Sequence, residues 1–235
     1  MPITARGAGT SIAGNAVGPG VVLDFSKHMN QIHDVRPDSR SAVVDPGVVL
    51  ASLQESAAPH GLRFGPDPST HNRATLGGMI GNNACGSRAL GYGRTSDNVR
   101  SLCVLTADGQ ILDLGPGANT PAMLAPLQTL VSENLTTIRA QFGRFTRQVS
   151  GYAFEQLLPE NNFNTARFLV GSEGTLGIVL QAEVELVAAP KHTVLIALGY
   201  DDMPTAADAV PGILVHKPVA CEGIDRRIVD TVRER

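Results

Sequence analysis

Three clusters of glycine limit most strongly what this chain can fold into. The chain has 25 glycines in 235 residues, and many of them gather in the segments 6–11, 75–87 and 171–179. Glycine weakens helices and strands, and it is favoured where the backbone turns tightly or approaches another group closely. The clusters therefore predict three loops that either lie against a ligand or pack tightly on a sheet.

The first cluster matches neither of the two common phosphate-binding motifs. Gly7 and Gly9 fit the start of a dinucleotide fingerprint, but Ile12 occupies the position of its third glycine. Gly9 and Gly14 have the spacing of a P-loop, but Asn15 stands where that motif needs lysine. A Rossmann-type NAD site and a nucleoside triphosphatase are both disfavoured.

A backbone anion site remains for this first cluster. The small residues Gly7, Ala8 and Gly9 allow a tight turn, and their N–H groups could bind a pyrophosphate together with the hydroxyls of Thr10 and Ser11. The alternative is an ordinary turn between two strands.

The other two clusters favour a large ligand more strongly. Residues 77–87 combine four glycines with the amides of Asn82 and Asn83, which predicts a segment that lies against a large flat molecule. Glycines at every third position of 171–177 would let the backbone approach an adenosine or ribityl chain. The alternatives are a tightly packed turn on a sheet for the second cluster and a bulged hairpin for the third.

Hydrophobic patterning predicts an α+β fold. A helix is expected after Pro46, ending near Gly61, and another over 203–210, with helix-rich sequence over 122–148 and a short helix or loop over 75–85. The expected strands are 21–25, 32–35, 41–44, 101–106, 111–114, 166–170, 178–187, 193–200 and 220–224. Hairpins are expected at 32–44 and 101–114.

Composition excludes several classes of function. The net charge is −3 and no long run of one sign occurs, so no nucleic-acid surface is indicated. No apolar stretch reaches the roughly 18 residues of a membrane span, and the first residues do not resemble a signal peptide, so a cytoplasmic location is expected. Three scattered cysteines and six scattered histidines form no metal-binding pattern, and no metal is expected.

Together, the segments resemble the FAD-binding (PCMH-type) domain of the vanillyl-alcohol oxidase superfamily. Within it, they are most similar to D-lactate and D-2-hydroxyglutarate dehydrogenases and to the FAD subunit of glycolate oxidase. Six segments in the order of the family carry the resemblance: RGAGTS at 6–11, PGV at 46–48, GLRFGPDPST at 61–70, TLGGMIGNNACGS at 75–87, YGRTSDNV at 92–99 and GSEGTLGIV at 171–179.

The resemblance implies two small α/β subdomains with an extended FAD between them. Residues 1–40 would be a truncated first subdomain with the pyrophosphate loop, 41–189 the second subdomain, and 190–235 the incomplete beginning of a cap domain. The chain is therefore expected to be cut at both ends.

The resemblance also implies which residues contact the cofactor. The first loop would wrap the pyrophosphate, the second cluster would face the flavin and its linker, and the third would hold the adenine end. The residues concerned are Arg6, Gly7, Ala8, Gly9, Thr10, Ser11, Pro68, Thr75, Leu76, Gly77, Gly78, Asn82, Asn83, Ala84, Glu173, Gly174, Thr175, Gly177, Ile178 and Val179.

Non-covalent FAD is implied because Thr10 occupies the position of the linking histidine of some relatives, and no cysteine precedes Gly77 and Gly78. The implied reaction is oxidation of a small D-2-hydroxy acid to a 2-oxo acid by hydride transfer to FAD. The catalytic base is expected outside this chain, and the electron acceptor is not indicated. Two alternatives stay open: a non-catalytic FAD-binding fragment, and another branch of the superfamily, such as an alkylglycerone-phosphate-synthase-like enzyme or a sugar-lactone oxidase.

Overall fold

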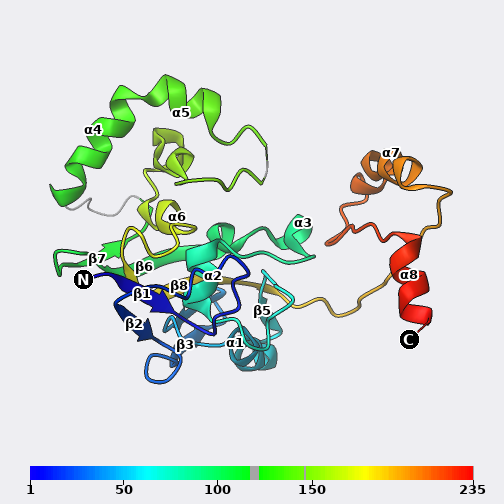
Figure 1. The fold of residues 1–235 in the computed structure, drawn as a ribbon, viewed down its shortest axis with the longest axis horizontal. Coiled ribbons are helices and arrows are strands. Elements are labelled where there is room, and N and C mark those ends of the chain that lie inside the picture. The colour runs from blue at the N-terminus through cyan, green and yellow to red at the C-terminus, as the bar shows by residue number, and fades with distance from the viewer. Residues whose placement is uncertain (117–121, 146, 235) are drawn as a thin grey trace.

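The chain folds around two β-sheets of unequal size (Figure 1). The computed structural model describes residues 1–116, 122–145 and 147–234. The small sheet pairs β1 (Ile3–Arg6) with β2 (Val21–Asp24) in parallel, with Ile3 opposite Val21. The first glycine cluster lies in the crossover between these two strands, directly after β1.

The large sheet has six strands, and β8 (Ile178–Ala188) lies at its centre. Along β8, the side chains of Ala182, Val184 and Leu186 alternate into the core, as expected for a strand with one buried face. β8 pairs antiparallel with three other strands and so joins the sheet together. The other five strands are β3 (Ile32–Arg36), β4 (Ser41–Val44), β5 (Leu62–Phe64), β6 (Val99–Leu105) and β7 (Ile111–Leu114).

Short helices connect and cover these strands. The α-helices are α1 (Leu50–Ala57), α2 (Leu76–Asn82), α3 (Ala89–Tyr92), α4 (Ala125–Glu133), α5 (Leu135–Gln141), α6 (Thr165–Leu169), α7 (Met203–Leu214) and α8 (Arg226–Arg233). Single 3₁₀ turns lie at Ala58–His60, Thr95–Asn98, Ala122–Leu124, Phe154–Leu157 and Pro159–Asn161.

The main core lies between the large sheet and helices α1 and α2. Its largest fully buried side chains include Leu50, Leu53, Phe64, Leu76 and Ile80. A second, smaller core holds the helical segment together and consists of Val131, Ile138, Leu157, Leu158 and Phe168. The main core therefore fixes α2, which carries most of the second glycine cluster.

Most of the sequence-based elements are confirmed, as is the α+β class. Both predicted hairpins form, as β3–β4 and β6–β7. The helix after Pro46 forms as α1 and its 3₁₀ extension, and Gly61 ends it in the left-handed conformation. The expected strand over 178–187 is β8, and the helix over 203–210 is α7.

The predicted strand over 166–170 is wrong, because this segment is helix α6. The Asn164 side chain accepts a hydrogen bond from the backbone N–H of Arg167 at 3.0 Å and so caps the helix. A short apolar run shows neither the helical nor the strand periodicity of hydrophobic residues, so the cap at Asn164 decides in favour of a helix. The third glycine cluster thus lies between a helix and a strand.

The predicted strands over 193–200 and 220–224 are also wrong, since neither is paired with another strand in the described residues. Val194 is 81% exposed and Leu195 is 93% exposed. A β-propensity becomes a strand only when a partner edge is available. In Figure 1 the chain after β8 runs as an arm away from the sheets toward α7 and α8. Beyond α7 the chain contacts α3, where Gly91 N donates a 3.1 Å hydrogen bond to Val219 O.

The sheet pairing bears on the expected subdomain boundary at residue 40. Because β3 pairs with β4, residues 32–36 belong to the large sheet. A boundary between the end of β2 and the start of β3 fits this topology better than one at residue 40, and the division into subdomains stays a proposal.

Candidate functional site

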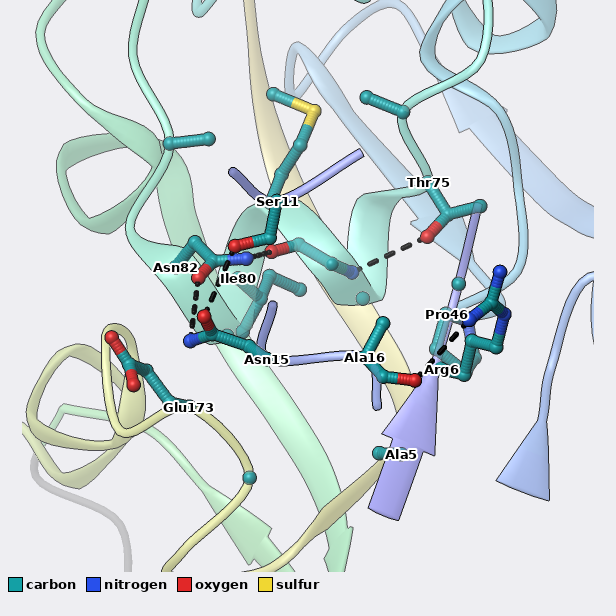
Figure 2. A pocket seen from close by; sticks show the side chains of 18 of the residues that line it. Ala5, Arg6, Ser11, Asn15, Ala16, Pro46, Thr75, Ile80, Asn82 and Glu173 are labelled. Atoms are coloured by element: carbon teal, nitrogen blue, oxygen red, sulfur yellow. Dashed lines mark hydrogen bonds between the residues drawn. The ribbon is translucent and has the colours of Figure 1, made fainter. Parts of the chain in front are cut away.

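The three glycine clusters converge on one cleft of about 310 Å³ (Figure 2). One side, which we call the first wall, consists of residues 3–24: β1, β2 and the crossover between them. The opposite side, the second wall, consists of α2 together with the loop 171–179. Residues far apart in the sequence therefore form a single elongated site between the small and the large sheet.

The first wall approaches the second through Gly7. A side chain at this position would overlap the Oγ1 atom of Thr75, the residue that precedes α2. Arg6 closes the loop by donating a hydrogen bond from Nη1 to Ala16 O at 3.3 Å (Figure 2). The absence of a Cβ at Gly7 thus allows the two walls to touch at one end of the cleft.

The second wall begins with a tightly packed helix start. Thr75 caps α2, because its Oγ1 accepts a hydrogen bond from Gly78 N at 3.4 Å. Gly77 donates to Pro46 O at 2.7 Å, and a Cβ on Gly77 would lie only 2.6 Å from Pro46 Cβ. This packing places the backbone of Gly77 and Gly78 at the surface of the cleft.

The loop 171–179 is fastened to the other end of α2. Gly171 N donates to Ile80 O and Glu173 N donates to Gly81 O, both at 2.9 Å. Glu173 has a left-handed φ of 55°, which is uncommon for a residue with a side chain. These bonds fix the position of the loop relative to the helix.

A chain of side-chain hydrogen bonds crosses the cleft. Ser11 Oγ donates to Asn15 Oδ1 at 3.1 Å, and Asn15 Nδ2 donates to Asn82 Oδ1 at 3.2 Å. Asn82 Nδ2 in turn donates to Gly78 O at 3.1 Å. Figure 2 shows this chain running from the first loop to α2.

Charge in the cleft comes from one residue of each sign. Arg6 is the only cationic side chain among the described residues that line it, and Glu173 is the only acidic one. Arg6 forms no ion pair within the described part of the chain. Close by, hydrogen bonds from the Ser26 hydroxyl and backbone lower the pKa of Asp24, with a further contribution from the charge of Arg6.

The structure brings most of the sequence-predicted site residues to this cleft. Those that line it are Arg6, Gly7, Ala8, Gly9, Thr10, Ser11, Pro68, Thr75, Gly77, Gly78, Asn82, Ala84, Glu173, Gly174, Gly177 and Val179.

Four predicted residues lie elsewhere. Leu76 is fully buried in the main core. Asn83 accepts a hydrogen bond from Ser96 N at 2.9 Å and lines an adjoining cavity of about 180 Å³. The Thr175 hydroxyl donates to Ser172 O at 2.6 Å, and Ile178 pairs with Leu105 in the large sheet.

Several lining residues were not anticipated from the sequence. Pro46, Thr70 and Ser172 lie inside motifs that the sequence analysis had already identified, so the motifs themselves contained the signal. Asn15 had no such signal, because only the fold brings it opposite Asn82. The lining residues not anticipated are Ala5, Asn15, Ala16, Phe25, Pro46, Thr70, Ala74, Met79, Ile80, Gly81, Leu169 and Ser172.

The described residues contain no group of three or more His, Cys, Asp or Glu side chains that could hold a metal ion. No helix in the described part of the chain is long and apolar enough to cross a membrane.

Part of this chain is similar to a known domain family. Residues 1–115 match a family described as an FAD binding domain, in agreement with the FAD cofactor expected from the sequence. Among solved structures, an alkyldihydroxyacetonephosphate synthase matches with a TM-score of 0.56 at 22% identity, over 81% of this chain and 30% of that one. At this identity the likeness shows the fold alone, and it supports the PCMH-type α+β architecture.

Curated proteins match over nearly the whole chain. D-2-hydroxyglutarate dehydrogenase of Escherichia coli (strain K12) is 32% identical over 98% of this chain and 24% of its own length. Glycolate oxidase subunit GlcD of Bacillus subtilis (strain 168) is 33% identical over 96% of this chain and 41% of its own. D-lactate dehydrogenase of Archaeoglobus fulgidus is 32% identical over 98% of this chain and 43% of its own length. The chain thus spans about a quarter of the length of the first of these relatives.

Proposed function

We propose, from the match of residues 1–115 to the FAD binding domain family, that this chain binds one FAD non-covalently in the cleft between the first and second walls. The observation that carries the proposal is the convergence of three separate glycine clusters on one cleft. A volume of about 310 Å³ lies at the lower end of the range of small-molecule sites, and further opening of the first wall would enlarge it.

The residues present fit such a cofactor. A side chain at Gly7 would collide with Thr75 and one at Gly77 with Pro46, so glycine at both positions lets the backbone that lines the cleft pack closely. Free backbone N–H groups in a glycine turn are suited to a pyrophosphate, and the guanidinium of Arg6, which forms no ion pair in the described chain, supplies a positive charge beside them. The described lining contains no histidine, cysteine or tyrosine to which a flavin could be attached covalently.

The order of the lining residues suggests how the cofactor would lie. Residues 6–11 would bind the pyrophosphate, Pro68 and residues 75–78 would face the flavin, and residues 173–179 would hold the adenine. The flavin-facing residues and the adenine-facing residues lie at opposite ends of α2. Thr75 lies at the start of the helix, and Glu173 N donates a hydrogen bond to Gly81 O near its end.

For the reaction, we propose oxidation of a small D-2-hydroxy acid of the lactate, glycolate or 2-hydroxyglutarate class to the 2-oxo acid. The names and the 32–33% identity of the curated relatives support this class. The bound flavin would supply the hydride acceptor, and this chain would hold and orient it. Residues 190–235 would then contribute to a substrate site, and no residue of this chain is assigned as catalytic base or electron acceptor.

The cofactor part is tested by equilibrium titration of the chain with FAD. We expect one FAD per chain, with a flavin absorption band that acid releases into the supernatant, while NAD does not compete. A chain that retains no flavin after unbound FAD is removed by gel filtration would refute the proposal, and flavin that remains attached after acid would refute the non-covalent mode.

The substrate part is tested by anaerobic addition of D-lactate, glycolate and D-2-hydroxyglutarate to the FAD-loaded protein purified from its native source, because the catalytic base is expected outside this chain; L-lactate is the stereochemical control. Bleaching of the flavin band by a D-acid or by glycolate, but not by L-lactate, is expected. Bleaching by none of them would remove the proposed substrate class and leave FAD binding standing.

A further inference from the structure

A single hydrogen bond joins the two walls of the cleft directly. Asn15 Nδ2 of the first wall donates to Asn82 Oδ1, at the end of α2, over 3.2 Å (Figure 2). In the described residues, no other hydrogen bond connects residues 3–24 with α2 or with the loop 171–179. The polar attachment of the first wall to the second therefore depends on one bond between two side chains.

The first loop holds Asn15 in position for this bond. Gly14 N donates to Ser11 O at 3.3 Å, and Val17 N donates to Gly14 O at 3.0 Å, so the chain turns tightly around Asn15. The Ser11 hydroxyl donates to Asn15 Oδ1 at 3.1 Å. Because Oδ1 is used in this way, the amide of Asn15 presents its donor group to Asn82.

The bond can break without disturbing the core. Asn82 is exposed and Asn15 is only half-buried, so water can replace either partner. The tip of the loop just before Asn15 is open as well: Ile12 is fully exposed, and a Cβ on Gly14 would meet no atom within 4 Å. The loop can therefore move away while α2 stays packed against the core.

We propose that the Asn15–Asn82 bond is a latch that holds the cleft closed in the cofactor-free chain and must break when FAD enters. This inference rests on the proposed function. With the latch closed, the cleft measures about 310 Å³, the lower end of the range for drug-sized ligands, and FAD with its two nucleotide halves is larger than these. Both latch residues line the cleft, so a cofactor extended along it competes with their bond. The free energy of the latch is thus subtracted from the affinity for FAD.

The test is a double-mutant cycle of Asn15→Ala, Asn82→Ala and the double variant. FAD association and dissociation are followed by stopped-flow flavin fluorescence. Each single substitution opens the latch in advance, so we expect FAD to associate about 2- to 10-fold faster and to bind tighter by the same factor, with an unchanged dissociation rate. The double variant should gain no more than the single variants, because both substitutions remove the same bond.

Two further measurements separate a latch from a general loosening of the fold. Asn134→Ala is the matched control, since it removes an exposed amide that donates to Leu130 O at 2.8 Å outside the cleft lining, and it should leave FAD association unchanged. In the absence of FAD, hydrogen exchange of residues 11–17 should be faster in Asn15→Ala, whereas exchange of β8 should not change.

Unchanged or slower FAD association in Asn15→Ala would overturn the latch. So would gains that multiply in the double variant, or an equal gain in Asn134→Ala. Titration of the unmodified chain with FAD is done first. If it takes up no FAD, the proposed function fails and the latch with it, whereas failure of the latch in a chain that takes up FAD leaves the proposed function standing.

Discussion

The two walls of the cleft are built in opposite ways. No residue of the first wall is buried, and its two strands pair over only four residues. In the second wall, Leu76, Met79 and Ile80 are at most 2% exposed, and the loop 171–179 leads directly into the central strand β8. The cleft therefore lies between a first wall with no buried residues and a second wall that is packed into the core.

This difference shows where a bound cofactor would matter for stability. A two-stranded unit is marginal by itself, and the first wall contributes nothing to the buried core. Segments with few buried contacts open at low free-energy cost, and a ligand that bridges them to a stable layer opposes this opening. We expect FAD to order the first wall and to leave the second almost unchanged.

The largest effect is expected from forcing the walls apart. Gly7→Ala places a Cβ where the Thr75 side chain now lies, so the first loop must shift away from α2. Overpacking of this kind should weaken FAD binding about 10- to 100-fold, measured by equilibrium titration.

Gly115→Ala is the matched control, because a Cβ there would meet its nearest neighbours at an ordinary 3.7 Å, away from the cleft. It should leave FAD affinity unchanged. Equal affinities for the two variants would mean that contact between the walls at Gly7 is irrelevant to binding.

A smaller effect is expected from removing the charge of the first wall. Arg6→Gln eliminates the only cation that lines the described cleft and should weaken FAD binding about 10-fold. The loss should shrink as salt is added, because the charge is partly solvent-exposed. Lys27→Gln removes one positive charge outside the cleft lining, and an equal loss in that variant would refute a specific role for Arg6.

The smallest effect is expected far from both walls. The hydrogen bond from Arg139 lowers the pKa of Glu160 from 4.5 to about 2. Because this pKa is lower in the folded chain, the stabilisation is present above about pH 4.5 and is lost as the pH falls through about 2. Arg139→Gln should give a small loss of Tm at pH 7 that disappears over that range, with unchanged FAD affinity. A clear change in affinity would show that the outlying helical segment is coupled to the cleft.

Much of the large sheet and of the helix that covers it could be predicted from the sequence, because local signals and tertiary packing agree there. Both hairpins, the helix after Pro46 and the strand over 178–187 formed as expected. The wrong predictions concern segments whose structure depends on a helix cap or on a partner strand. Asn164 caps a helix in the run predicted as a strand, and the apolar segment 193–200 pairs with no strand in the described residues.

The site shows the same limit. Glycine-rich motifs indicated the three loops, because such spacing has a local physical cause. Asn15 was missed, since it reaches the cleft only through its contact with Asn82, 67 residues away. This relationship is not visible in a linear sequence.

The central claim is that FAD lies between the walls and orders the first one. Hydrogen exchange of the chain, followed at short times with and without FAD at about 100 times its Kd, tests this most directly. We predict that amides of residues 3–24 slow by up to about 100-fold, while the core strands β4, β6 and β8 stay unexchanged in both samples. Saturation with FAD without any slowing of residues 3–24 would contradict the account.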